Sequence, residues 1–124
     1  MTGEQYQIKA MRTNDGRNRV RLFDKTAGLT KINLGDVLNA SLGLSGEVGE
    51  LNDQIKKWIF HEKPLDENHL MKELGDVLWY VALMADAFGW NLDDIMEMNI
   101  KKLEARYPDG FDTFRANNRK AGDI

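Results

Sequence analysis

Residues 33–60 read NLGDVLNASLGLSGEVGELNDQIKKWIF, and this stretch decides the fold class. Its large apolar residues recur at steps of seven, four, three, four and three, which predicts one amphipathic helix from about Asn33 to Phe60. The predicted apolar stripe comprises Val37, Leu44, Val48, Leu51, Ile55 and Trp58. Glycines at positions 43, 46 and 49 lie in the same helix. They indicate either a ridge that another backbone or a ligand approaches closely, or a break in the helix.

The helical pattern continues on both sides of this stretch. Asp66 as an N-cap and Gly89 as a C-terminal stop predict a second long helix, whose apolar stripe is Leu70, Leu74, Val77, Val81, Met84 and Phe88. Asn91 and Pro108 bound a further helix. Residues 4–12 predict a short helix, whereas residues 13–31 predict mostly loop. Strand patterns are almost absent, so the predicted fold class is all-α.

The composition predicts one domain over residues 1–124. Of these 124 residues 42% are hydrophobic and 30% are charged, which permits a real core and disfavours disorder. Area scaling predicts a folded surface of ~6,800 Å² against ~20,600 Å² for the unfolded chain, so about two-thirds of the surface would be buried. The absence of cysteine excludes disulfide scaffolds, thiolate zinc sites, iron–sulfur clusters and cysteine nucleophiles.

The charge and hydropathy patterns also bear on partners. No apolar run approaches the length of a membrane span, and the N-terminus carries no apolar signal core. We therefore expect a cytoplasmic protein with no membrane partner. The net charge of −3 gives no general reason to bind nucleic acid, so none is predicted.

Two pairs of carboxylates stand out on the two long helices. Glu47 and Glu50 are three residues apart beside one apolar stripe, and Glu73 and Asp76 are three apart beside the other. Antiparallel packing of these helices would bring four acids to one edge, where their repulsion favours a bound cation. Hard oxygen ligands suit Mg²⁺, or Mn²⁺, better than zinc or copper. The alternative is that the four acids are solvated surface charges.

Further polar residues extend this pattern. Asn99, Lys102 and Arg106 share one face of the helix that ends at Pro108, where lysine and arginine are suited to holding phosphate oxygens. The alternative is a solvated basic face near a helix C-terminus. Tyr80 projects one turn beyond Asp76 and is a candidate to stack on a base.

The sequence resembles the MazG-like all-α nucleoside triphosphate pyrophosphohydrolases. The resemblance is carried by Gly-Leu-Ser-Gly-Glu-Val-Gly-Glu at 43–50, Glu-Leu-Gly-Asp-Val-Leu-Trp-Tyr at 73–80 and Asn-Ile-Lys-Lys-Leu-Glu-Ala-Arg-Tyr-Pro-Asp-Gly-Phe at 99–111. These match the family's Glu-x-x-Glu, Glu-x-x-Asp and Asn-x-x-Lys-x-x-x-Arg elements. Residues 37–111 thus form a motif-bearing core, followed by a polar tail over 112–124.

The resemblance implies a MazG-like bundle of four to five helices that assembles as a homodimer or homotetramer. It implies Mg²⁺-dependent hydrolysis of a nucleoside triphosphate to the monophosphate and pyrophosphate. Residues 47, 50, 73 and 76 match the family's metal-binding carboxylates, and Asn99, Lys102 and Arg106 match its substrate-binding helix. One of the carboxylates is expected to take the proton of the attacking water. Glu50 is a candidate, but Glu47 and Glu73 are not distinguished from it.

Other functions compete with this interpretation. A phosphoribosyl-ATP pyrophosphohydrolase would share the fold and the metal chemistry. A non-catalytic helical dimerisation module would use the acids only as surface charge. A ferritin-like di-iron bundle needs Glu-x-x-His pairs, whereas the third position here is Glu50 or Asp76, which disfavours iron.

Two further expectations concern the surfaces of the long helices. The glycine ridge is expected roughly opposite the apolar stripe of its helix, while Met71, Leu78 and Trp79 lie off the stripe of theirs. Two apolar sides per helix exceed what one small bundle buries, which predicts self-association. His69 lies one turn before Glu73, where it either orients that carboxylate or remains a partly exposed neutral histidine.

Overall fold

The computed structural model describes residues 1–27 and 31–119. The helices of these ranges are α1 (Gly3–Met11), α2 (Asn18–Thr26), α3 (Leu34–Phe60), α4 (Glu67–Phe88), α5 (Leu92–Arg106) and α6 (Thr113–Asn117). Within them no strand is present, which confirms the all-α fold class. No helix of the described ranges combines the length and the apolar character that crossing a membrane requires.

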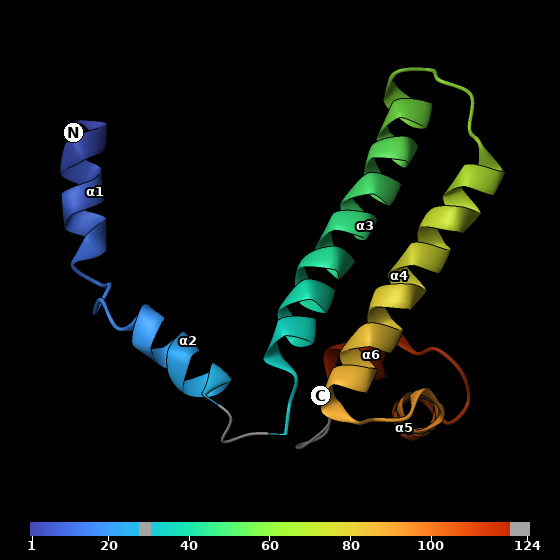
Figure 1. Cartoon of the computed structure of the whole chain (residues 1–124). Helices are drawn as coiled ribbons and strands as arrows, with labels where there is room; N and C mark the ends of the chain where they lie inside the picture. Colours follow the sequence, from blue (N-terminus) through green and yellow to red (C-terminus); the bar gives the residue numbers. More distant parts are fainter. Residues whose placement is uncertain (28–30, 120–124) are drawn as a thin grey trace.

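An antiparallel pair of long helices, α3 and α4, forms the centre of the molecule (Figure 1). The Asp66 side chain caps α4 by accepting a hydrogen bond from the backbone N–H of His69 at 3.0 Å. Gly89 ends the helix in the left-handed conformation at φ 71°, which glycine adopts without strain. The backbone N–H of Asn33 donates a hydrogen bond to the Ala87 carbonyl at 3.2 Å and connects the beginning of α3 to the end of α4. The predicted bounds of both helices are confirmed within one or two residues.

The glycines of α3 do not break the helix, and Gly43 packs against α4. A Cβ added to Gly43 would lie 2.2 Å from Cε1 of Tyr80, so only glycine lets this ring pack against the α3 backbone. The ridge was expected roughly opposite the packed stripe. Gly43 departs from this expectation, whereas an added Cβ at Gly46 or Gly49 would meet no atom within 4 Å, and both of these glycines line a cavity. The continuous helix rules out the helix-break alternative, and close approach is shown at Gly43.

The packed face of α4 differs from the predicted apolar stripe. Glu73 is 6% exposed, whereas its apolar neighbour Leu74 is 51% exposed. On α3, Val48 and Trp58 belong to the predicted stripe, yet both side chains are exposed, that of Trp58 by 47%. The helices are rotated so that carboxylates occupy part of their contact, and large apolar side chains are left outside. Hydrophobic periodicity alone had predicted that those side chains lie in the core.

Two of the helices depart from the sequence-based expectation. The prediction of mostly loop over 13–31 is wrong for α2, and α6 adds a short helix in the polar tail, so the described ranges contain six helices rather than four to five. Polar contacts stabilise the first turn of α2, since Arg21 pairs with Asp15 and donates to the Asn18 side chain at 3.0 Å. Val20 and Phe23, three residues apart, give this helix an apolar side, but the signal is short and lies among polar residues.

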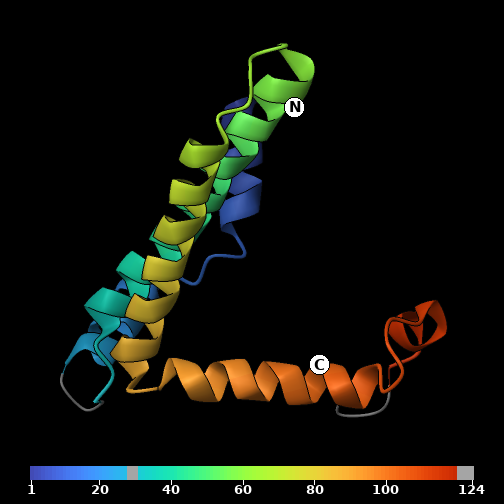
Figure 2. The same ribbon diagram turned by 90° about the vertical axis from the view of Figure 1, so that its right-hand side faces the viewer.

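The single chain is open rather than bundled. Figure 2 shows α5 leaving the lower end of the α3–α4 pair and extending away from it. In the described part of the chain, extensive helix–helix packing is confined to α3 and α4. The surface is 10,571 Å², well above the ~6,800 Å² expected from area scaling. The expected burial of two-thirds is therefore not reached, because α1, α2, α5 and α6 do not close over the central pair.

Candidate metal centre

Three carboxylates meet between α3 and α4. Glu47 projects from α3, and Glu73 and Asp76 project from adjacent turns of α4. One oxygen from each residue lies within 4.8 Å of the others. The spacing of three residues places Glu73 and Asp76 on one face of α4, and the antiparallel packing supplies Glu47 opposite them. The structure thus brings together three of the four acids that the sequence singled out.

The cluster is electrostatically unfavourable without a partner. Glu47 Oε2 and Glu73 Oε2 are buried and form no hydrogen bond within the described residues. The pKa of Glu47 is raised from 4.5 to about 7, first because its protonated form would donate a hydrogen bond to Glu73. Burial and the charges of Glu50, Asp76 and Glu73 raise this pKa further. Such a group either keeps a proton or binds a cation.

The donor set fits a hard divalent cation. Every candidate ligand atom is a carboxylate oxygen, and two of these oxygens are buried without a partner. Mg²⁺ and Mn²⁺ prefer oxygen ligands, and Mg²⁺ is held by a few carboxylates while it retains water or phosphate oxygens. Glu47, Glu73 and Asp76 are therefore suited to hold such an ion.

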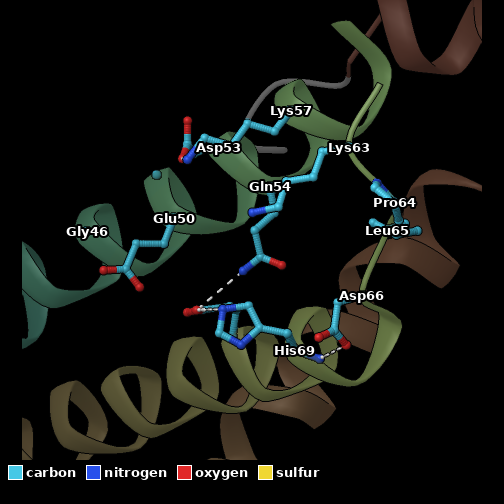
Figure 3. Close-up of a pocket in the computed structure, with 12 residues that line it drawn as sticks. Gly46, Glu50, Asp53, Gln54, Lys57, Lys63, Pro64, Leu65, Asp66 and His69 are labelled. Carbon is cyan, nitrogen blue, oxygen red and sulfur yellow. Dashed lines mark hydrogen bonds and ion pairs between the residues drawn. The ribbon is translucent and has the colours of Figure 1, made fainter. Parts of the chain in front are cut away.

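Glu50 lies beside the cluster but outside it. Its side chain is on the side of α3 that faces α4 (Figure 3), and it lines a neighbouring cavity. Its negative charge contributes to the raised pKa of Glu47. Glu50 is exposed, so its carboxylate remains available to a bound molecule.

A cavity of about 550 Å³ adjoins the carboxylates at the closed end of the helix pair. Its lining comprises Gly46, Gly49, Glu50, Asp53, Gln54, Lys57, Lys63, Pro64, Leu65, Asp66, His69 and Glu73. Because Glu73 belongs to both the cavity and the cluster, a molecule in the cavity lies next to the candidate ion. The volume is within the range of small-molecule sites. Lys57 and Lys63 supply positive charge on its wall, although Lys57 also pairs with Asp53 at 2.7 Å.

Two side chains, one from each of the long helices, contact Glu73. His69 Nε2 lies 3.2 Å from Glu73 Oε1, and Gln54 Nε2 donates to the same oxygen at 3.4 Å. The sequence indicated His69 by its position one turn before Glu73. It did not single out Gln54, although Gln54 follows Glu47 by seven residues and so lies on the same face of α3.

The predicted substrate-binding residues lie in two separate places in the structure. Tyr80 is half-buried, with its ring against Gly43 and edge-on to Trp79 at 5.1 Å between centroids. Asn99, Lys102 and Arg106 lie on α5, which extends away from the carboxylates of its own chain (Figure 2). The guanidinium of Arg106 is 5.9 Å from the Tyr107 ring centroid. One chain therefore does not place the α5 residues at the cluster.

A comparison with protein families identifies the origin of this arrangement. The sequence profile described as "MazG nucleotide pyrophosphohydrolase domain" matches residues 36–111, more than half of the chain. The chain belongs to the MazG family. The match begins in the first turn of α3 and includes all of α4 and α5, so it contains every candidate site residue.

Two curated proteins are similar to this MazG chain. The "Gene 37 protein" of Mycobacterium phage L5 is 37% identical over 84 residues, which cover 64% of this chain and 73% of the phage protein. The "Uncharacterized protein YvdC" of Bacillus subtilis (strain 168) is 30% identical over 73 residues, or 52% of this chain and 69% of that protein. No solved structure matches the chain.

Proposed function

We propose that this chain hydrolyses a nucleoside triphosphate to the nucleoside monophosphate and pyrophosphate, with Mg²⁺ as cofactor. The observation that carries the proposal is the group of Glu47, Glu73 and Asp76, which has two buried, unpartnered oxygens and adjoins, through Glu73, a cavity suited to a small molecule. Membership of a nucleotide pyrophosphohydrolase family supports the same reaction.

The chemistry divides between the ion and the chain. Bound Mg²⁺ would neutralise charge on the triphosphate and favour ionisation of a water molecule. Glu47, Glu73 and Asp76 would hold the ion, and Glu73 would bring it next to the cavity that it also lines. Water adds to phosphorus as the α,β-phosphoanhydride breaks, and pyrophosphate leaves. We assign Glu50 as the base that accepts the proton of this water, because its carboxylate is exposed beside the cluster rather than enclosed in it.

The site is proposed to be completed by a second copy of the chain. Asn99, Lys102 and Arg106 match the family's substrate-binding helix, yet α5 extends away from the carboxylates of its own chain. Large apolar side chains on the outer face of α4, including Leu74, Leu78 and Trp79, are exposed. A homodimer or homotetramer would cover this face and bring an α5 helix to the carboxylates of a neighbouring copy.

The test is release of pyrophosphate from a panel of nucleoside triphosphates with Mg²⁺ or with EDTA. Phosphoribosyl-ATP belongs in the panel, because its preferential hydrolysis would assign the alternative pyrophosphohydrolase activity. We expect Mg²⁺-dependent formation of the monophosphate and pyrophosphate in equal amounts. Release of inorganic phosphate alone, or no turnover of any member, would contradict the proposal. A chain without turnover that still self-associates would support the dimerisation-module alternative.

A further inference from the structure

Glu73 is held by donors from two different helices. His69, four residues earlier on α4, places Nε2 at 3.2 Å from Glu73 Oε1, and Gln54 on α3 donates to that oxygen at 3.4 Å. Figure 3 shows the two side chains converging from opposite sides of the gap between the helices. The other oxygen, Oε2, is buried and has no hydrogen-bond partner in the described ranges. The two carboxylate oxygens therefore have different surroundings.

This arrangement restricts the carboxylate of Glu73. The contacts of His69 and Gln54 with Oε1 oppose rotation of the carboxylate, so the buried Oε2 keeps its position. The donors also offset part of the negative charge that the cluster concentrates. Hydrogen bonds to ligand carboxylates orient them, and loss of such a partner typically weakens metal affinity or activity by about 10–100-fold.

The position of His69 is itself determined by the sequence around it. The Asp66 cap accepts from the His69 backbone N–H at 3.0 Å and fixes the first turn of α4. The side chain of His69 then lies one turn before Glu73 on the same face. That side chain is 56% exposed, so it contributes little burial to folding. The contact with Glu73 is the one side-chain interaction that the structure shows for this imidazole among the described residues.

We propose that His69 and Gln54 are positioning residues, which hold Glu73 through Oε1 so that Oε2 is presented to a divalent cation. The inference rests on the proposed function for its biological meaning, but it concerns ion binding by the free protein. It extends the candidate site from its carboxylates to two residues that act on the ion through Glu73.

The experiment measures Mn²⁺ binding to the intact, nucleotide-free protein at fixed pH, from the electron paramagnetic resonance signal of free Mn²⁺. Four variants are compared with the wild type: His69→Ala, Gln54→Ala, the double variant, and His69→Gln. His61→Ala is the matched control, because His61 is exposed at the end of α3 outside the cluster and the cavity lining.

We expect His69→Ala to weaken Mn²⁺ binding by about 10-fold and the double variant to weaken it further, because one donor partly compensates for loss of the other. His69→Gln, which keeps a donor, should restore affinity to within about 3-fold. His61→Ala should bind as the wild type does. The melting temperature without metal should be the same for His69→Ala and His61→Ala, which separates positioning from a general loss of fold.

Unchanged Mn²⁺ affinity in both His69→Ala and the double variant would overturn the inference, whatever the enzymatic activity. A parallel loss of affinity and of metal-free melting temperature, without rescue by His69→Gln, would assign a structural role and also overturn it. If the wild type binds Mn²⁺ with the expected dependence on His69 but hydrolyses no nucleotide, the inference stands and the proposed function fails.

Discussion

The two oxygens of the Glu73 carboxylate have different surroundings. Glu73 is the buried charged residue of the α3–α4 contact, where an isolated anion would be unfavourable. One of its oxygens accepts a hydrogen bond from Gln54 and lies 3.2 Å from His69 Nε2, while the other is buried without a partner in the described residues. Burial of this charge is consistent with a site whose stability depends on a cation.

Removing one charge from the cluster should separate activity from stability. Glu47→Gln or Asp76→Asn is expected to abolish turnover, because an ion ligand is lost. The same change should raise the melting temperature of the metal-free protein, because repulsion is relieved. Pyrophosphate release and thermal melts in EDTA measure the two effects. Asp86→Asn, an exposed position near the end of α4, is the matched control and should change neither.

Mg²⁺ should raise the melting temperature of the wild type but not that of Glu47→Gln. If Mg²⁺ fails to stabilise the wild type, the three carboxylates do not share an ion.

The stability of the metal-free protein should depend on pH through Glu47. Its pKa is 4.5 in the absence of these contacts and about 7 in the folded chain, so the folded state binds more protons between these values. Stability from this group is present below pH 4.5 and is lost as the pH rises through about 7. Melting temperatures in EDTA across this range should fall with rising pH, and Glu47→Gln should make the curve flatter. An unchanged slope in the variant would show that another group is responsible.

At the scale of single elements, α3 is a continuous helix in which glycines leave part of the surface without side chains. The Asn33 and Asp66 caps account for where the long helices begin, and Gly89 accounts for where α4 ends. Inside α3, glycine serves close packing at Gly43 and leaves the cavity wall open at Gly46. The two positions should therefore respond differently to the same substitution.

Gly43→Ala is expected to destabilise the protein by about 1–3 kcal/mol, because the new Cβ would overlap the Tyr80 ring. Gly46→Ala meets no atom within 4 Å and should stabilise the helix by up to about 1 kcal/mol. Urea denaturation monitored by circular dichroism measures both. Equal effects of the two substitutions would contradict the close packing of Tyr80 on α3.

At the scale of the whole molecule, the open single chain leaves much apolar surface exposed. Besides the outer face of α4, exposed large side chains occur on α1, α2 and α5, and include Ile8, Phe23 and Met98. The accessible surface of the chain exceeds that of a typical folded chain of this size. Association with further copies would remove part of this surface from water.

Sedimentation velocity at micromolar concentration should show a homodimer or a larger species. Leu78→Asp, on the outer face of α4, is expected to shift the protein toward the monomer and to lower turnover, because α5 of a neighbouring copy would no longer reach the carboxylates. Leu78→Met keeps an apolar side chain of similar volume and should leave association intact. A wild-type monomer with full activity would refute the shared site.

The sequence alone determined the local features of this protein. The caps at Asp66 and Asn91, the left-handed stop at Gly89 and the carboxylate pairs at steps of three act within one helix, so local spacing predicts them. Tertiary structure decided what lies between the helices. Packing places Glu73 inside and Leu74 outside, leaves Glu50 beside the cluster and brings Gln54 to Glu73. These outcomes depend on how α3 and α4 are rotated against each other. This rotation is set by contacts between residues far apart in the sequence, so helical periodicity does not predict it.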